Sequence, residues 1–393
     1  MIYTEHTYDK YINGVLGGLI MSIASTLHLL LKGKITGISG TLFRAITFGD
    51  FGYNICFLSG MILIPSLIRA FTKKCFYNRF LEEPIIYTDS LSIIGFFISG
   101  FLVGFGTKMA NGCTSGHGVC GLPRLSKRSF AAVGTFLLFG FGFATLRYYV
   151  KFLENDFILD KKRKDEIIIP DNIIKIISII FFCLSIIVFI LIMIFKVIKD
   201  KVYEFKEILI SFLIGALFSL GLMESGMSKR HLVLLFLSIG KDWDATLICV
   251  LGAAVGLNLI TFNLILKKME KPIFHNKFQL PDKTEIDIKL LIGAAIFGIG
   301  WGWAGICPGP AVLCFYFYMP QTIIFMVMLV CGQLIEYKID KKIENLFNRN
   351  NNNEEVTVKI EEDDLSVGVR ISRFKESQIE SNPEPKEIKI NNK

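Results

Sequence analysis

Residues 104–120 read GFGTKMANGCTSGHGVC, and residues 298–314 read GIGWGWAGICPGPAVLC. Aligned without a gap, the two stretches share glycines, an alanine and two cysteines at one constant offset. The matching pairs are Gly104 with Gly298, Gly106 with Gly300, Ala110 with Ala304, Cys113 with Cys307 and Cys120 with Cys314. Each stretch follows a glycine-rich apolar run and precedes another apolar run. Self-similarity of this kind predicts an internal repeat.

The chain around these stretches is strongly apolar. Of its 393 residues, 52% are hydrophobic and 20% are charged, and the mean hydropathy is +0.50. Helices that cross a bilayer need roughly 20 apolar residues. Suitable runs lie at about 14–31, 52–71, 91–107, 129–150, 173–197, 208–223, 245–266, 289–306 and 322–337. The sequence therefore predicts an all-α, polytopic membrane protein of the cell membrane, with about nine membrane-crossing helices plus short half-helices.

The repeat extends over most of the chain. Ser39-Gly40 and Ser225-Gly226 form a looser matching pair, each at the mouth of a short apolar stretch. Repeat one is predicted at about 10–150 and repeat two at about 205–340, and the run at 173–197 has no counterpart. One extra crossing turns the second half upside down, so two pseudo-symmetric, inverted repeats are expected, a plan common in transporters. A membrane transport domain is thus expected over residues 1–340.

Residues 341–393 differ in composition from the rest. They are rich in asparagine and charge and poor in apolar residues, which predicts a hydrophilic, disordered tail. The net charge of +8 comes from short loops between apolar runs, so lipid headgroups and water are the expected surroundings of these cations, and no nucleic-acid partner is expected. Both sets of alternate loops carry Lys and Arg, which leaves the orientation open.

The interrupted segments are the predicted substrate site. Irregular backbone at membrane depth is tolerated where it is buried or lines a wet cavity, and the N–H groups of a following half-helix attract anions. Cys113 and Cys307 lie at the two breaks, and Cys120 and Cys314 follow each of them by seven residues. Other predicted lining residues lie beside the breaks: Thr114, Ser115, Pro308, Gly309, Ser39, Gly40, Ser225 and Gly226.

Thiols suit a soft anion. A protonated thiol is a weak, polarizable donor, which attracts an anion without trapping it. A doubly negative ion that carries sulfur, such as thiosulfate, fits both the soft donor and the helix starts. Composition alone also leaves sulfate, sulfite and sulfide open.

Two other polar residues have open roles. His117 is predicted either to relay protons or donate to the anion, or to cap a tight turn between glycines. Lys108 lies inside an apolar run, where it is expected either to attract the anion or to extend to the interface.

The motif GFGTKMANGCTSGHGVCGLPRLSKRS resembles the signature of the YeeE/YedE sulphur-transport family. GISG, ESGM at 224–227 and GWGWAGICPGP are similar to other blocks of that family, and the resemblance covers about 14–338. It implies an inner-membrane thiosulfate carrier in which thiols pass the ion by S–H hydrogen bonds, with Cys113 and Cys307 as the two central groups. It also implies a small soluble sulfur-carrier protein as a partner, and some relatives are linked to selenium.

The family's further N-terminal cysteine has no counterpart before Cys56, and Ser39 or Ser22 is the expected replacement. The rival hypotheses are a membrane thiol oxidoreductase or sulfurtransferase, a channel, a sensor, or a transporter of a related anion or selenium compound. Exchange enzymes usually carry a low-pKa thiolate or a C-x-x-C motif, and this chain has no C-x-x-C. We expect no enzymatic activity, no cofactor and no metal.

Overall fold

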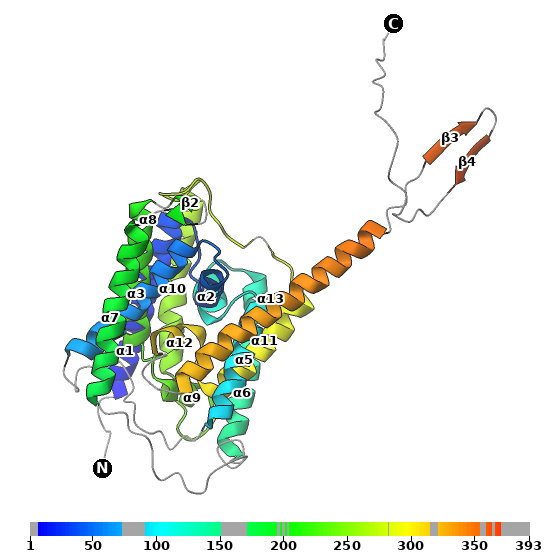
Figure 1. Ribbon diagram of the computed structural model, residues 1–393. Coiled ribbons are helices and arrows are strands. Elements are labelled where there is room, and N and C mark those ends of the chain that lie inside the picture. The colour runs from blue at the N-terminus through cyan, green and yellow to red at the C-terminus, as the bar shows by residue number, and fades with distance from the viewer. Residues whose placement is uncertain are drawn as a thin grey trace. The chain divides into compact units, whose positions relative to one another are not determined.

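The computed structural model describes residues 7–72, 91–150, 171–194, 197–198, 201–202, 204–281, 283–314, 321–353, 359–363 and 366–370. The chain divides into two compact units, Met1–Tyr337 and Lys338–Lys393. The first contains the membrane helices, whose order along the chain can be followed in Figure 1 by colour.

The described residues of the first half form four long and two short helices. The long ones are α1 (Thr7–Lys32), α3 (Phe51–Phe71), α5 (Ile93–Met109) and α6 (Lys127–Tyr149). The short ones are α2 (Ile38–Ile46), between α1 and α3, and the π-helix η1 (Thr114–Gly121), between α5 and α6.

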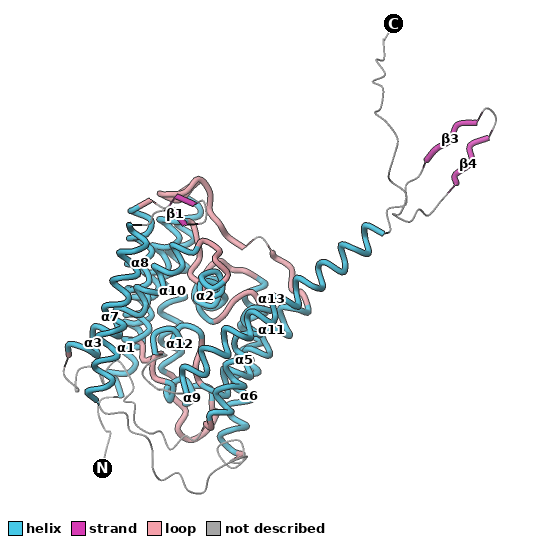
Figure 2. The backbone as a smooth tube through the Cα atoms, in the orientation of Figure 1, coloured by secondary structure: helices cyan, strands magenta, loops and turns pink. Residues whose placement is uncertain are grey.

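The second half repeats this order. After α7 (Asp171–Ile194) come the long helices α8 (Phe205–Glu224), α10 (Thr246–Lys268), α11 (Ile288–Ala304) and α13 (Gln321–Asn353). The short helix α9 (Arg230–Leu237) lies between α8 and α10, and α12 (Pro308–Cys314) lies between α11 and α13. In both halves the described helices therefore run long, short, long, long, short, long, and Figure 2 shows the loops that join them.

The number of crossings agrees with the sequence. Among the described residues, seven helices are long and apolar enough to cross a membrane, and the count rises to nine if each bent pair is one span. The bent pairs are α5 with η1, at 46°, and α11 with α12, at 43°. The chain is an all-α, multi-pass integral membrane protein.

Equivalent helices of the two halves run in opposite directions. Gly17 near the start of α1 lies against Ser225, just past the end of α8, whereas Lys32 at the end of α1 bonds to Ser211 near the start of α8. In the same way α5 and α11 pack antiparallel, because Gly106 lies against Phe297 whereas Gly300 lies against Ser99. Antiparallel packing of equivalent helices is the arrangement that inverted repeats produce.

The directions of the long helices place the short helices on opposite sides. The ends of α1 and α5 and the starts of α3, α6, α8 and α11 lie on one side, here called side one, so α2 and η1 extend inward from it. The helices α9 and α12 follow the ends of α8 and α11 and extend inward from the other side, side two. The short helices of the two halves thus approach each other across the thickness of the domain.

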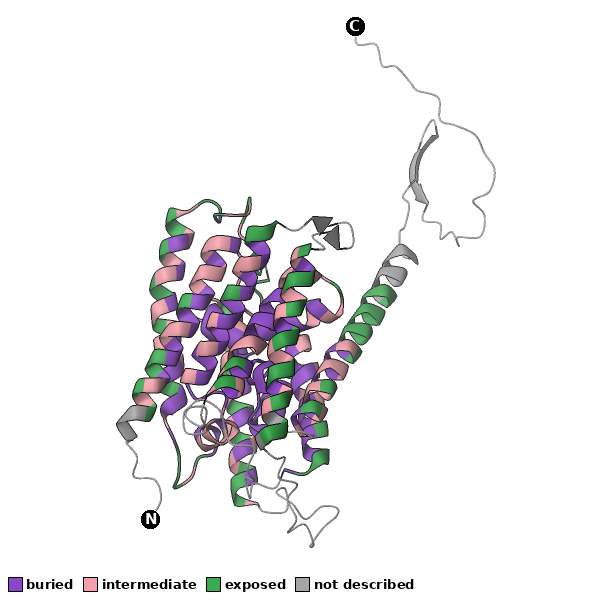
Figure 3. Ribbon diagram, turned by 60° about the vertical axis from the view of Figure 1, so that its left-hand side comes forward, coloured by how far each residue is buried: buried purple, intermediate pink, exposed green. Residues whose placement is uncertain are grey.

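Glycines allow the long helices to touch. A Cβ at Gly104 of α5 would lie 1.9 Å from the main-chain oxygen of Leu329 in α13, and one at Gly60 of α3 would lie 2.0 Å from that of Phe212 in α8. No side chain fits at such distances, so small residues let these backbones approach, as is common between membrane helices. Figure 3 shows the buried residues gathered between the helices and the exposed ones on the outer surfaces.

The unpaired helix α7 packs mainly on α3 and exposes much of its surface. At least half of the surface is exposed at Ile176, Ile180 and Ile187, as expected for a helix face that contacts lipid. A short β-hairpin follows α7, formed by the two-residue strands β1 (Val197–Ile198) and β2 (Lys201–Val202).

The second unit differs in part from the predicted disordered tail. Helix α13 continues to Asn353, well past the predicted boundary at 341, and the strands β3 (Lys359–Asp363) and β4 (Ser366–Arg370) form an antiparallel hairpin in which Lys359 pairs with Arg370. The helix extends because residues 336–346 contain neither proline nor glycine. The rest of the predicted tail lies outside the described residues.

Candidate functional site

The first break lies between α5 and η1. Asn111 adopts a left-handed conformation with φ 55°, and a Cβ at Gly112 would lie 2.6 Å from the His117 ring, so only glycine fits there. Cys113 is the N-cap of η1, and its main-chain oxygen accepts a hydrogen bond of 2.9 Å from the amide of His117. The break therefore places Cys113 at the start of a short inward helix.

The second break repeats this geometry with different residues. Gly305 ends α11 with φ 69°, and Pro308 is the first residue of α12, a position that proline favours because its missing N–H is not needed. The main-chain oxygen of Cys307 accepts a hydrogen bond of 3.0 Å from the amide of Ala311. Cys113 and Cys307 are thus equivalent in local structure as well as in sequence.

The two thiols lie near each other in the interior. Cys113 is 1% exposed and Cys307 is 3% exposed, and both belong to one buried cluster. The Cys307 thiol lies within electrostatic range of Cys113 and within hydrogen-bonding range of the Thr114 side chain and the Gly309 amide. Four of the predicted site residues are therefore brought together from opposite halves.

A third short helix reaches the same point. The amide of Ile38 in the first turn of α2 donates to Ser115 Oγ at 3.2 Å, and Cys113 Sγ lies 3.2 Å from the same hydroxyl. Gly309 packs against Ile38, since a Cβ there would lie 3.0 Å from the Ile38 side chain. The starts of α2, η1 and α12 converge on the paired thiols.

Cys120 and Cys314 lie farther along the short helices, and each contacts the loop before the other short helix of its own half. Cys120 Sγ donates to the main-chain oxygen of Thr36 at 3.4 Å, and Cys314 Sγ donates to that of Ser228 at 3.7 Å. Thr36 precedes α2 and Ser228 precedes α9. The second cysteine of each pair thus ties together the two short helices of its half.

His117 is a capping residue in this structure. Its Nε2 lies 3.1 Å from the main-chain oxygen of Ala110, which can only accept, so Nε2 carries the proton. Its Nδ1 lies 3.2 Å from Ser129 Oγ and accepts from that hydroxyl. Both ring nitrogens are used to join the end of α5 to the start of α6, which corresponds to the second of the two predicted roles.

Lys108 is half-buried near the end of α5. Its Nζ lies 4.1 Å from the centre of the Phe43 ring and 5.3 Å from that of Tyr337. A cation–π contact with α2 and α13 therefore holds it away from the thiols. This position on side one fits a residue near the mouth of the site rather than one that touches the paired cysteines.

The break near Ser39-Gly40 differs from the prediction. Ser39 and Gly40 lie inside α2, which begins at Ile38, and the irregular backbone is at residues 33–37 instead. Gly33, with φ 67°, ends α1, and Gly37 faces Gly116 of η1, since a Cβ at Gly37 would lie 3.8 Å from the Gly116 Cα. The break lies a few residues before the predicted one, because two glycines that precede Ser39 already interrupt the helix.

Ser225 and Gly226 do form a break, but they do not begin a helix. Ser225 caps the end of α8, its hydroxyl donates to the Leu222 oxygen at 3.0 Å, and Gly226 has φ 74°. The following helix, α9, begins at Arg230. Thr36 and Ser228 are equivalent in the structure, because each lies two residues before a short helix and accepts from the second cysteine of its half. The predicted match of Ser39 with Ser225 is therefore shifted in register.

A row of hydroxyls lies beside Cys120. Ser25 of α1 is within hydrogen-bonding range of the Cys120 thiol and lies 3.1 Å from Oδ1 of the buried Asn258 in α10. Ser22, a predicted replacement for the missing cysteine, bonds to the same Oδ1 at 2.7 Å. Cys56 is fully buried in a separate cluster with residues of α7 and α8. The polar side chains near Cys120 thus come from α1 and α10.

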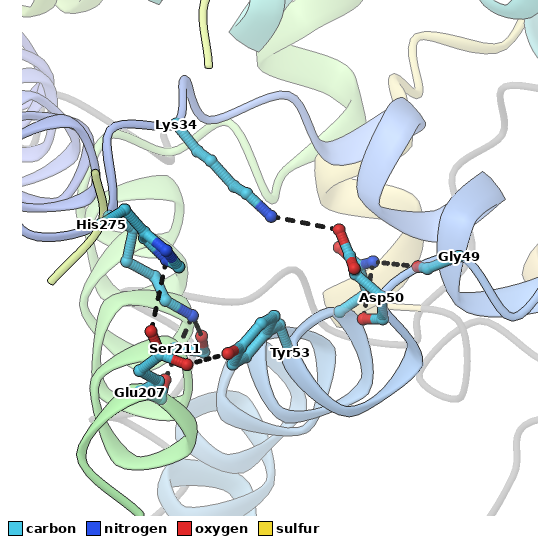
Figure 4. A network of polar contacts seen from close by, with 9 residues as sticks. Lys34, Gly49, Asp50, Tyr53, Glu207, Ser211 and His275 are labelled. Carbon is cyan, nitrogen blue, oxygen red and sulfur yellow. Dashed lines mark hydrogen bonds and ion pairs between the residues drawn. The ribbon is translucent and has the colours of Figure 1, made fainter. Parts of the chain in front are cut away.

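The sequence analysis missed a charged network on side one, shown in Figure 4. Lys32 is 1% exposed, and its Nζ donates to Ser211 Oγ at 2.6 Å and to the Glu207 main-chain oxygen at 3.2 Å. The Tyr53 hydroxyl donates to the Glu207 carboxylate, and His275 Nε2 lies 3.4 Å from it, an ion-pair contact without hydrogen-bond geometry. The network joins α1 and α3 of one half to α8 and the 269–287 loop of the other.

Two neighbours extend this network toward water. Lys34 Nζ lies 3.2 Å from Asp50 Oδ2, and both side chains are partly exposed. Burial lowers the pKa of His275, and the positive charges of Lys32 and Lys34 lower it further against the opposing effect of Glu207. The ionisable residues at the very ends of the apolar runs are the signal in the sequence that could have predicted this network.

Arginines cap the end of α11 on side two. Arg147 Nη1 donates to the Trp303 oxygen at 2.5 Å, and Arg230 Nε donates to the Ala304 oxygen, so the last carbonyls of the helix are satisfied. Arg230, Ser228, Cys314 and Thr322 line a cavity of about 10 Å³. That volume holds one water at most, so this cavity is too small for a sulfur dianion.

Metal binding has no support in the described part of the chain. Among those residues, no three His, Cys, Asp or Glu side chains are grouped so that they could hold a metal ion.

Comparison with known proteins gives the family. Residues 5–143 match the model of the family described as Sulphur transport, and residues 206–349 match that of a family of unknown function, DUF6691. A probable transporter of Xylella fastidiosa, strain Temecula1, is 38% identical over 137 residues, which cover 35% of this chain and 95% of the relative. The chain belongs to the YeeE/YedE sulphur-transport family.

Other relatives are of similar size. A second probable transporter of that strain is 34% identical over 126 residues, covering 32% of this chain and 84% of the relative, and one from strain 9a5c is 36% identical over 137 residues. Because about a third of this chain covers most of each relative, each relative is about as long as one of the two predicted repeats of this YeeE/YedE chain. Family and helices together support membrane transport of a sulfur compound at the plasma membrane.

Proposed function

We propose that this protein carries thiosulfate across the membrane and that the thiols of Cys113 and Cys307 pass the ion by S–H hydrogen bonds. The single observation that carries the proposal is that these two buried thiols, one from each inverted half, lie within electrostatic range of each other at the starts of two inward helices. Membership of the sulphur-transport family supports the same substrate class.

The surroundings of the thiols suit a soft, doubly charged anion. Cys113, Cys307, Thr114 and Ser115 are all buried and bring two thiols and two hydroxyls to one point. Each group is a neutral donor, and sulfur is a soft partner for a terminal sulfur atom. Neutral donors attract the ion without the tight binding that a buried cation would impose, so the ion can leave again.

The proposed route continues along the short helices toward both sides. Toward side one it runs between α2 and η1, where Gly37 faces Gly116 and Cys120 bonds to Thr36. Toward side two it runs between α9 and α12, where Cys314 bonds to Ser228 beside the small cavity. Both ends are tightly packed, so transport requires the short helices of each half to separate in turn. A small soluble sulfur-carrier protein is proposed as the acceptor of the delivered sulfur.

The test is uptake of labelled thiosulfate into vesicles that contain the purified protein. Wild type is expected to take up the intact ion, with competition by unlabelled thiosulfate stronger than by sulfate, sulfite or selenite. Cys113→Ala and Cys307→Ala are each expected to lower the rate at least tenfold. Cys183→Ala is the matched control, because Cys183 is exposed on α7, and it is expected to transport normally.

Two results would count against the proposal. Uptake that survives both central substitutions would remove the thiols from the route. Recovery of chemically altered sulfur, dependent on an added redox partner, would favour the oxidoreductase or sulfurtransferase hypothesis instead.

A further inference from the structure

A carboxylate is buried in α13 beside the short helix α2. Glu336 is 2% exposed, and its Oε1 lies 3.2 Å from Lys289 Nζ at the start of α11. Its other oxygen, Oε2, has no hydrogen-bond partner among the described residues. An acid inside a membrane helix is costly and usually functional.

A second acceptor without a donor lies one turn away. Gln333 is 1% exposed, its Nε2 donates to the main-chain oxygen of Ser39 at 3.0 Å, and its Oε1 has no partner among the described residues. Residues three apart on a helix are neighbours on one face. Two buried oxygens that both need a donor therefore lie on the same face of α13.

A donor placed between these two oxygens would satisfy both. A proton on Oε2 would let that oxygen donate, and Gln333 Oε1, one turn earlier on the same face of α13, is the acceptor we assign to it. A buried acceptor left unpaired is unfavourable, so a donor at this place would be stabilising.

The pair is connected to the thiols through α2. Gln333 holds the oxygen of Ser39, and the preceding residue, Ile38, donates its amide to Ser115 Oγ, which contacts Cys113 Sγ. A change in the charge of Glu336 thus acts on the short helix that closes side one of the route.

Cations are present on the elements next to this part of α13. Lys289 of α11 pairs with it directly, Lys108 of α5 lies over the ring of Tyr337, and Arg44 is the cation of α2. Tyr337 is the adjacent titratable residue on α13 within the same compact unit. Lys289 pairs with one oxygen of Glu336, and the other oxygen is buried without a partner among the described residues.

We propose that Glu336, with Gln333, is a proton-binding site that couples thiosulfate movement to proton movement. The inference rests on the proposed function, since the proton is taken up with the anion and offsets part of its charge. Protonation removes the negative charge of Glu336, loosens its pairing with Lys289 and frees α2 to move away from η1; loss of the proton restores the closed arrangement.

The experiment compares driven accumulation with exchange in vesicles that contain the full chain. In wild type, a pH gradient imposed with the outside acidic is expected to concentrate labelled thiosulfate several-fold. Glu336→Gln is expected to abolish this accumulation but to keep the exchange of labelled for unlabelled thiosulfate at equal pH. Gln333→Leu is expected to weaken the pH response, and Glu270→Gln, at an exposed acid after α10, is expected to behave as wild type.

The proton site also has a readout that needs no transport. Infrared difference spectra on acidification are expected to show a protonated-carboxyl band in wild type that is missing in Glu336→Gln. The proposal is overturned if that variant accumulates thiosulfate like wild type, if it loses exchange along with accumulation, or if its infrared band is unchanged. A wild type that moves no sulfur anion but shows the band would contradict the proposed function and leave the proton site standing.

Discussion

Cys120 and Cys314 make the same contact in opposite halves of the protein. Each thiol donates to the main-chain oxygen of the residue two positions before a short helix, Thr36 before α2 and Ser228 before α9. Because the halves are oriented oppositely, one contact closes the structure toward side one and the other toward side two. Both are formed at once, so the structure is closed toward both sides at these contacts.

Removal of either contact is expected to have a similar effect. Cys120→Ala and Cys314→Ala should each lower the free energy of unfolding by about 1–2 kcal/mol, since each loses one buried hydrogen bond and leaves a small void. Chemical denaturation in detergent measures this, with Cys249→Ala at a half-buried position of α10 as the control. A large loss in one variant with none in the other would contradict their equivalence.

His117 is expected to be required for the first break. His117→Ala removes two buried contacts, to Ala110 and Ser129, and should cost about 2–3 kcal/mol of stability and most of the uptake. His117→Gln retains a donor and an acceptor and should recover part of both. Thermal unfolding and vesicle uptake are the measurements, and full uptake by the alanine variant would show that the cap is dispensable.

The contact between α5 and α13 is expected to depend on glycine. Gly104→Ala places a Cβ 1.9 Å from the Leu329 oxygen, so the helices must separate, at a cost of at least about 2 kcal/mol. Gly134→Ala is the matched control in α6, because no atom lies within 4 Å of its Cβ, and it should be neutral or slightly stabilising through helix propensity. The melting temperature of Gly104→Ala should therefore fall, whereas that of Gly134→Ala should stay the same or rise slightly.

The loop before α10 is expected to make stability depend on pH. Burial alone would raise the pKa of Asp244, but the hydrogen bonds from the Thr246 hydroxyl and amide and the charge of Lys10 outweigh it, so the pKa lies below its ordinary value. A lowered carboxyl pKa stabilises the fold above the unfolded-state value, and that contribution is lost as the pH falls through the folded-state value.

Asp244→Asn is therefore expected to be less stable than wild type at neutral pH, and the difference should shrink on acidification toward and below the ordinary pKa of aspartate. Melting curves of both proteins over that range measure it. A difference that stays constant with pH would mean that the charge of Asp244 contributes nothing.

Helices and helix breaks were predicted correctly where the signal in the sequence was local. All nine predicted runs are helices, because a long apolar segment in lipid must satisfy its own backbone hydrogen bonds. The breaks at Asn111-Gly112 and before Pro308 lie where predicted, because a left-handed turn and a proline restrict the chain whatever surrounds it. The match of Cys113 with Cys307 anticipated their equivalent local geometry.

Prediction failed where several local signals competed. Between Gly33 and Gly40 the sequence contains three glycines, and only the packing of Gly33 against the 269–287 loop and of Gly37 against η1 decides which of them end α1 and precede α2. The role of His117 was open for the same reason, since its partners Ala110 and Ser129 lie on different helices.

The sequence by itself determined the number of membrane helices, the places where two of them break and the correspondence between the halves, since hydropathy, glycine and proline act over a few residues. Tertiary structure alone decided that the thiols of Cys113 and Cys307 come within electrostatic range of each other, that Lys32 bonds to Ser211, and that Gln333 bonds to Ser39. Each of these pairs is more than 150 residues apart, and contacts at that separation depend on how whole helices pack, which no local pattern of residues specifies.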